Sequence, residues 1–317
     1  MGRLSGLTEV GFGAAQFGNL NRVTTDEASV EAVREAWHRG IRYFDTAPHY
    51  GIGLSERRLG AALRDYPRAE YVLSSKVGRA LVPSPERAGQ DDEHGFVTPA
   101  VLRREWDFSR DGIRRSVEES LERLGLDHLD IAYLHDPDDH WWIASTEGIA
   151  ALIELRDEGT VRAIGAGMNQ SGMLVDFIRE CDIDVVMLAG RYTLLENSAA
   201  DELLPFALER GVGVVAAAIY NSGLLSRAEV PSDSRYDYVQ APAELIERAR
   251  AIAAVCGRHG VTLPDAAVQY PLRHPAVVSV VVGTRTAEQV DSSVDRYEAA
   301  IPDVLWDELA ETGLVPR

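Results

Sequence analysis

The chain has 317 residues, of which 45% are apolar and 26% charged, so it is long enough for one large barrel or two average domains. Its formal net charge of −18 disfavours binding to nucleic acid and to anionic membrane surfaces, and we expect neither as a partner. The two cysteines, Cys181 and Cys256, have no paired spacing, which argues against a disulfide scaffold or a zinc ribbon.

The ends and connections of the chain carry few signals of targeting or division. No apolar run reaches about 18 residues, so we expect no membrane span. The first residues, MGRLSGLTEV, lack the apolar core of a signal peptide, and a cytoplasmic location is expected. Because the sequence contains no linker or low-complexity segment, we predict a single domain over residues 1–317.

Short apolar runs alternate with longer amphipathic stretches along the chain. The runs predicted to be strands cover 10–18, 41–47, 71–78, 129–135, 161–169, 184–192, 211–218 and 277–283. The stretches predicted to be helices cover 26–39, 55–63, 110–124, 145–158, 199–210, 242–259 and 262–273. Several of these helices stop at a glycine, as a left-handed helix end requires.

This alternation predicts parallel strands joined by right-handed crossovers, either in a closed barrel or in an open doubly wound sheet. An open dinucleotide-binding sheet would carry a Gly-rich phosphate turn after its first strand. The segment GFGAAQFG at 11–18 does not have that G-x-G-x-x-G spacing before a helix. Eight regular units without the turn favour an α/β fold of the (β/α)8 TIM-barrel type, with extra helices at the C-terminal end.

Polar residues follow three successive predicted strands, at the end where a barrel places its chemistry. Asp45 closes the second strand, and His49 and Tyr50 follow in the next loop. Lys76 closes the third strand, and His135 closes the fourth. Each residue alone has an ordinary structural explanation, such as a solvated lysine or a helix-capping aspartate. The four types together at adjacent strand ends favour a catalytic site.

The four residue types suit hydride transfer to or from a carbonyl, which requires a proton to move on the oxygen. A free tyrosine has a pKa of about 10 and is a poor base at neutral pH. A nearby Lys76 ammonium would stabilise the Tyr50 phenolate and lower that pKa, and Asp45 would orient the lysine. His135 would donate a hydrogen bond to the substrate oxygen.

The segment YFDTAPHYGIGLSERRLGAAL at 43–63 resembles the signature of the aldo-keto reductases, and the similarity covers nearly the whole chain. The family's catalytic Asp, Tyr, Lys and His correspond to Asp45, Tyr50, Lys76 and His135. The resemblance implies a barrel that binds NAD or NADP without a Rossmann motif. It also implies that no metal is needed.

The cofactor residues of the family transfer less completely. Met168 and Asn169 stand where similar proteins contact the nicotinamide carboxamide, with Met168 replacing a hydroxyl residue. Ala189 stands in place of a glutamine, and Ala217 in place of a tyrosine that stacks on the nicotinamide. The sequence leaves open whether Tyr220 compensates.

Two further segments resemble those that bind the pyrophosphate and the adenosine of the cofactor in this family. The residues implied for the pyrophosphate are Asn221, Ser222, Gly223 and Leu224, and those implied for the adenosine end are Gly283, Thr284, Arg285 and Gln289. The first group would act through backbone amides. Because Arg285 is the one basic residue of the second group, we favour NAD slightly over NADP, although one arginine can bind a phosphate bidentately.

The segments LHDPDDHWW, LAGRYTLLE and AAAIYNSGLL look like the sugar dehydrogenases of this family, of the L-fucose and D-threo-aldose 1-dehydrogenase type. L-galactose and pyridoxal 4-dehydrogenases are relatives of that branch. This resemblance implies oxidation of an aldose at C1 to a lactone, with Tyr50 as the base. The side chains that we expect to contact substrate are those of His49, Asp136, Trp141 and Trp142. The long polar stretch 83–106 would lie over the mouth of the site as a substrate loop.

Three alternatives remain open. The protein could be a general aldehyde reductase or a pyridoxal dehydrogenase, or a non-catalytic barrel that binds cofactor as a sensor or subunit. The intact set of four residues argues against the last. Asp136, Asp138 and Asp139 could bind a divalent cation, but capping or contact with sugar hydroxyls fits them better, so no metal site is predicted. We expect a small sugar or aldehyde as the partner, and a monomer or homodimer.

Overall fold

The structure, a computed structural model, describes residues 2–237 and 239–316. The barrel strands are β1 (Val10–Gly13), β2 (Tyr43–Asp45), β3 (Val72–Val77), β6 (Leu129–His135), β7 (Val161–Met168), β8 (Val185–Ala189), β9 (Gly213–Ala217) and β12 (Val277–Gly283). They form a closed, all-parallel barrel in the spatial order β1–β12–β9–β8–β7–β6–β3–β2. The predicted (β/α)8 barrel is therefore confirmed.

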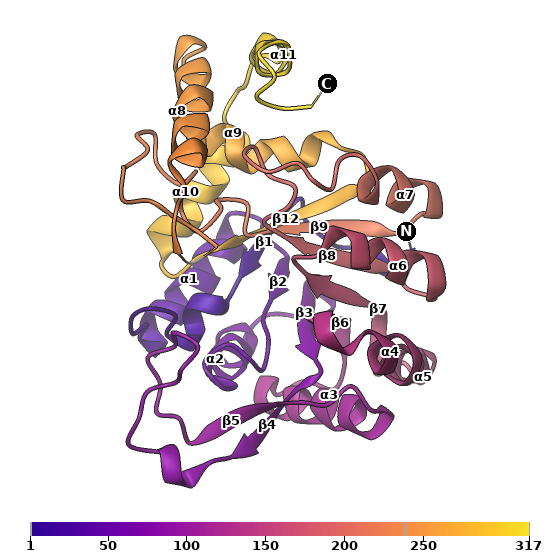
Figure 1. The fold of residues 1–317 in the computed structure, drawn as a ribbon. Coiled ribbons are helices and arrows are strands. Elements are labelled where there is room, and N and C mark those ends of the chain that lie inside the picture. Colours follow the sequence, from indigo (N-terminus) through magenta and orange to yellow (C-terminus); the bar gives the residue numbers. More distant parts are fainter. Residues whose placement is uncertain (1, 238, 317) are drawn as a thin grey trace.

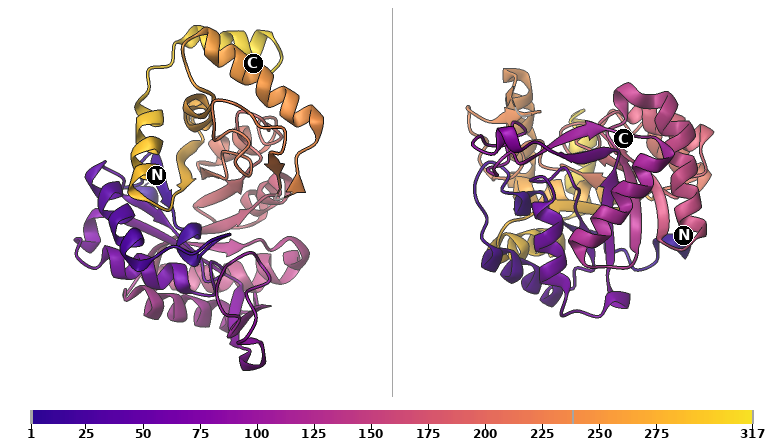
Figure 2. Two further views of the ribbon diagram at one scale, coloured as in Figure 1. Left: turned by 90° about the vertical axis from the view of Figure 1, so that its left-hand side faces the viewer. Right: turned by 90° about the horizontal axis from the view of Figure 1, so that it is seen from below.

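Helices lie on the outside of these strands (Figures 1 and 2). They are α1 (Asp26–His38), α2 (Leu54–Leu63), α3 (Arg110–Leu124), α4 (Trp141–Ile143), α5 (Ile149–Asp157), α6 (Ser171–Glu180), α7 (Leu203–Arg210), α8 (Ala243–Arg258), α9 (Leu263–Gln269), α10 (Ala287–Glu298) and α11 (Asp303–Glu311). The last of these is the extra C-terminal helix that follows the eighth unit.

The observed helix ends match the capping residues seen in the sequence. The observed strand ends match the predicted apolar runs less well. Thr25 accepts a hydrogen bond from the Ala28 amide at the start of α1, and Gly125 ends α3 with φ = 69°. The predicted strand 10–18, however, ends at Gly13, and a 3₁₀ turn (Ala15–Gly18) follows. Residues that follow a barrel strand are also apolar where they line the cavity, so hydrophobicity does not mark the end of the strand.

Several helices differ from the prediction. No range was predicted for α6 or α10, and α7 begins at Leu203 rather than at residue 199. The predicted helix 145–158 is interrupted by a wide π-helical turn at Ala144–Gly148, after which α5 continues.

Side chains fill the barrel and close its N-terminal end. Tyr133 and Ile131 of β6 belong to an interior cluster against which Leu4 and Leu7 pack. Leu4 lies so close to Gly213, the first residue of β9, that a Cβ there would come within 2.6 Å of it. The space that remains for a ligand lies at the other end, where the strands finish.

The predicted substrate loop 83–106 forms the long connection and the second strand of an antiparallel hairpin. β4 (Arg79–Pro83) pairs with β5 (Leu102–Trp106), at the bottom of Figure 1. Arg104 forms a buried ion pair with Asp92 at 2.6 Å and donates to the carbonyl of His49 at 2.6 Å. These contacts hold the hairpin against the loop that carries Tyr50. A smaller hairpin, β10 (Arg235–Tyr236) with β11 (Val239–Gln240), follows β9.

Candidate active site

A cavity of about 520 Å³ lies at the C-terminal ends of the strands. Its lining includes all four predicted catalytic residues, Asp45, Tyr50, Lys76 and His135, together with His49, Arg79, His94, Phe96 and Asp136. It also includes Gln16, Met168, Asn169, Ala189, Ala217 and Gly283. One space thus joins the predicted catalytic residues to several of the predicted cofactor residues.

A buried ion pair forms the floor of the cavity. The Lys76 ammonium donates to Asp45 Oδ2 at 2.7 Å and to the carbonyl of Thr46 at 3.0 Å. Ser74 donates to the other oxygen of Asp45 at 2.6 Å, and the hydroxyl of Tyr43 lies 3.0 Å from Ser74. Neighbouring strands β2 and β3 supply these groups, so their register fixes the position of the lysine.

Tyr50 is held by a close approach of two loop backbones. A Cβ on Gly18 would lie 2.5 Å from the carbonyl carbon of Tyr50, and one on Gly51 would lie 2.3 Å from the oxygen of Gly18. Gly51 also has φ = 62°, which few other residues adopt readily. The ring of Tyr50 lies 4.9 Å from the Lys76 ammonium, within the range of a cation–π contact.

The positive charge of Lys76 opposes the effect of burial on the pKa of Tyr50. Burial raises the pKa of Tyr50 above its ordinary value, and the Lys76 charge acts in the opposite direction. Burial alone would lower the pKa of Lys76, but Asp45 and Tyr50 raise it, so the lysine stays protonated. The sequence predicted a lowered tyrosine pKa. The lysine offsets only part of the rise in the pKa of Tyr50, because desolvation is the larger effect.

Two of the three histidines that line the cavity, His49 and His135, are neutral. Burial, with the charges of Arg79 and Lys76, holds the pKa of His135 well below its usual value. Burial, followed by Arg79 and Arg104, lowers the pKa of His49 to about 2. A neutral imidazole still has one N–H group to donate, so His135 can bind a substrate oxygen without a charge.

These low pKa values predict a loss of stability in mild acid. Below about pH 6.5 the unfolded chain binds a proton at each histidine, whereas folded His49 and His135 do not. We expect the free energy of unfolding to fall by about 1 kcal/mol for each of these two histidines between pH 6 and pH 5. Urea titrations of the wild type and of His49→Gln at both pH values would measure this. An equal loss in the two proteins would contradict the assignment.

Two of the four predicted substrate residues line the cavity, and two do not. His49 and Asp136 face it. Trp141 instead packs edge-on against Phe177 of α6 at 4.8 Å, and Trp142 is 77% exposed. The prediction for the two tryptophans is corrected: the chain enters α4 directly after the Asp-rich turn, and this helix directs both rings away from the strand ends.

The predicted nicotinamide end of the cofactor site is lined by small or flexible side chains. Met168 ends β7 and Asn169 follows it, and both line the cavity. Ala189 and Ala217, which end β8 and β9, line it as well. Tyr220 does not compensate for the alanine at 217, because its hydroxyl accepts a hydrogen bond from Arg296 of α10 at 2.8 Å and its ring does not line the cavity.

Unpaired polar atoms mark the neighbouring wall. Among the residues that the structure describes, Gln16 Oε1 and Thr284 Oγ1 are buried without a hydrogen-bond partner. Gln16 lies against Gly283, where a Cβ would come within 2.8 Å of its amide nitrogen. Because buried polar groups are normally paired, these atoms suit a polar ligand that lies over the C-terminal ends of β1 and β12. The residues present therefore fit a dinucleotide.

The segment predicted to bind pyrophosphate is a compact turn. The amides of Asn221, Gly223 and Leu224 donate to carbonyls of the same segment at 3.0–3.2 Å. The Asn221 side chain bridges Gly190 and Thr193. Ser222 has φ = 58°, so the turn is left-handed at successive residues. In this conformation the three amides are engaged within the turn, and binding a phosphate there would require it to open.

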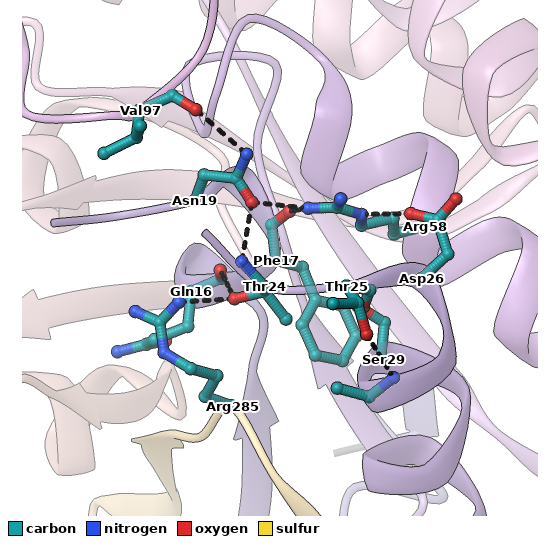
Figure 3. A network of polar contacts seen from close by, with 11 residues as sticks. Gln16, Phe17, Asn19, Thr24, Thr25, Asp26, Ser29, Arg58, Val97 and Arg285 are labelled. Carbon is teal, nitrogen blue, oxygen red and sulfur yellow. Dashed lines mark hydrogen bonds and ion pairs between the residues drawn. The ribbon is translucent and has the colours of Figure 1, made fainter. Parts of the chain in front are cut away.

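Arg285 is also engaged, within the network shown in Figure 3. Its guanidinium donates to the carbonyls of Leu20 at 2.6 Å and Arg22 at 2.8 Å, and to the Thr24 hydroxyl. Gln289 accepts from the Arg285 amide at 2.8 Å, so it positions the arginine. The predicted adenosine-binding arginine therefore holds the loop between β1 and α1.

The polar and aromatic lining residues that sequence reasoning missed are Gln16, Arg79, His94 and Phe96. Arg79 lies three residues after Lys76. His94 and Phe96 lie in the stretch 83–106, which was predicted to be a substrate loop without any single residue being named.

Among residues 2–237 and 239–316, no three His, Cys, Asp or Glu side chains are grouped to hold a metal ion. In that same part of the chain, no helix is long and apolar enough to cross a membrane.

Comparisons with known proteins identify the family of the chain. The model of the aldo/keto reductase family matches residues 9–313. A D-threo-aldose 1-dehydrogenase from Pseudomonas sp is 50% identical over 97% of this chain and 94% of its own. A pyridoxal 4-dehydrogenase from Microbacterium luteolum is 39% identical over 98% and 95%. An aldo-keto reductase from Bacillus halodurans in its holo form superposes with a TM-score of 0.75 at 26% identity, covering 96% and 92%. The chain therefore belongs to the aldo/keto reductase family and is an NAD(P)-dependent oxidoreductase.

Proposed function

We propose that the protein oxidises the C1 hemiacetal of an aldose to the lactone, with Tyr50 as the acid–base group. The observation that carries the proposal is the placement of Tyr50, Lys76, Asp45 and His135 around one cavity. The 50% identity to a D-threo-aldose 1-dehydrogenase supports an aldose as the substrate.

Each residue has one task in this reaction. Tyr50 in its phenolate form accepts the proton of the C1 hydroxyl, and the Lys76 charge lowers the cost of forming that phenolate in the buried cavity. Neutral His135 donates a hydrogen bond to the same oxygen and sets its direction. Asn169 and Gln16 would hold the nicotinamide dinucleotide, which takes up the hydride when bound.

A second candidate is reduction of an aldehyde, including pyridoxal. The raised pKa of Tyr50 supports it, because a protonated tyrosine at neutral pH is an acid ready to protonate a carbonyl oxygen. The 39% identity to a pyridoxal 4-dehydrogenase adds a related substrate.

Absorbance of the reduced nicotinamide separates the two candidates. Purified protein would be mixed with NAD or NADP and with L-fucose, L-galactose, D-arabinose or pyridoxal in turn. Growth of the band with an aldose supports C1 oxidation. If the band grows with none of the sugars and reduced cofactor is consumed with simple aldehydes, the proposed C1 oxidation is replaced by aldehyde reduction.

We infer that NAD is the preferred cofactor, since the hydrogen bonds of Arg285 are made to Leu20, Arg22 and Thr24. A 2′-phosphate would have to displace these partners. We expect kcat/KM for NAD to exceed that for NADP by at least about tenfold, the equivalent of one charge-assisted hydrogen bond.

Steady-state kinetics with both cofactors would test this preference, with Arg22→Gln as the second protein. The exposed Arg22 is close enough for its charge to lower the pKa of Arg285, after burial. A preference for NADP that disappears in Arg22→Gln would assign the phosphate to Arg22 and contradict the inference.

A further inference from the structure

A second ion pair lies directly beside the catalytic residues. Arg79 and Asp136 form it across neighbouring strands, one following β3 and the other following β6. Both line the cavity that contains Tyr50 and His135. Asp136 Oδ2 lies 3.7 Å from His135 Nε2.

Both residues are fixed by the backbone. Asp136 has φ = 43°, a left-handed conformation for a residue with a side chain, and its amide donates to the carbonyl of Gly167 at 3.0 Å. Arg79 follows Gly78, which has φ = 98°, and its guanidinium lies 4.5 Å from the ring of Trp106. An ion pair held in this way presents the same hydrogen-bonding groups to every ligand that enters.

The pair leaves hydrogen-bonding capacity unused. Among the described residues, the contacts of Asp136 with Arg79 and His135 use Oδ2, and Oδ1 makes no hydrogen bond. Arg79 Nε is buried without a partner. Burial raises the pKa of Asp136 even though Arg79 opposes it, as is typical of a carboxylate that lacks part of its solvation.

Arg79 also determines which nitrogen of His49 can donate. Its Nη1 lies 3.3 Å from His49 Nδ1, and since arginine can only donate, Nδ1 must be the acceptor. The proton of neutral His49 is therefore on Nε2. The wall of the cavity thus contains an acceptor at Asp136 and a donor at His49, with Arg79 linking the two.

We propose that Arg79, Asp136 and His49 bind the hydroxyl group on the carbon next to the reacting carbon. The substrate is then a 2-hydroxyaldehyde or its cyclic hemiacetal. This proposal rests on the proposed function for the identity of the reacting carbon. A hydroxyl can donate to Asp136 Oδ1 and accept from His49 at once, whereas a methylene group would leave both unpaired. Sites built to bind a hydroxyl reject analogues that lack it.

The test compares each aldose with its 2-deoxy counterpart in the wild type and in Asp136→Asn. We expect the variant to lose about 10- to 100-fold in kcat/KM for the hydroxylated aldose, as for one hydrogen bond to a charged group. For the 2-deoxy aldose we expect a change of less than about threefold. Arg79→Gln should show the same selective loss, because it releases both Asp136 and His49. Asp139→Asn, which removes the same charge from an exposed position in the same turn, should change neither substrate.

Equal losses on both substrates would mean that the pair only supports the fold of the site, and no loss on either would mean that substrate does not touch it. Either result overturns the proposal. If the wild type oxidises no aldose, the proposed C1 oxidation fails on its own. The same variants would then be compared in reduction of glyceraldehyde, which has a neighbouring hydroxyl, and propanal, which has none.

Discussion

Tyr50→Phe is expected to lower kcat by at least about 100-fold while binding of the nicotinamide cofactor is retained. The substitution removes only the hydroxyl that exchanges a proton with the substrate oxygen. The ring contacts with Lys76 at 4.9 Å and with Phe96 at 6.2 Å remain, so the cavity keeps its shape. Steady-state rates with the substrate found by the absorbance panel, and fluorescence titration with reduced cofactor, would measure the two quantities.

Tyr66→Phe provides the matched control. Tyr66 stacks on Trp37 at 4.3 Å, outside the cavity, so loss of its hydroxyl should leave kcat unchanged. Turnover by Tyr50→Phe at a rate close to the wild type would show that another group moves the proton, and the mechanism given above would be wrong.

Lys76→Met is expected to have the largest effect on stability. The substitution leaves the carboxylate of Asp45 buried beside Ser74 without its counter-charge. Removing one partner of a buried ion pair costs about 3–5 kcal/mol of unfolding free energy. Activity should fall as well, because burial then raises the pKa of Tyr50 without opposition. Denaturant titration and steady-state kinetics would measure the two effects.

The double variant Asp45→Asn/Lys76→Met separates the two effects. Neutralising the aspartate should restore part of the lost stability but none of the activity. As a comparison, Arg103→Met breaks the exposed ion pair with Glu105 and should cost less than about 1 kcal/mol. A Lys76→Met protein as stable as the wild type would show that Asp45 is solvated or protonated in the folded state, and would contradict the buried ion pair.

The sequence by itself predicted the barrel and brought the candidate catalytic residues to one rim. Eight buried, β-branched runs separated by capped helices allow few arrangements, because parallel strands need helical crossovers of one hand. Once the strands are parallel, their C-terminal ends meet at one rim. The residue types at Asp45, Lys76 and His135 could therefore be assigned to one site before any distance was known.

Only the tertiary structure decided which other side chains reach that site. Trp141 and Trp142 share a segment with Asp136, yet the helix that follows directs the two tryptophans outward and leaves the aspartate in the cavity. Arg79 and His94 enter it from a hairpin whose sequence shows no more than a polar insertion. Periodicity reports which face of an element is buried, but not where a loop turns.

The structure also decided the hydrogen-bond partners of Arg285 and the direction of the pKa shift of Tyr50, which the sequence did not reveal. The single arginine at the predicted adenosine end is engaged by Leu20, Arg22 and Thr24, which lie more than 260 residues before it in the chain. The pKa of Tyr50 depends on how much water its cavity admits as well as on Lys76. Both are properties of long-range contacts and desolvation, which depend on positions in space that the order of residues alone does not specify.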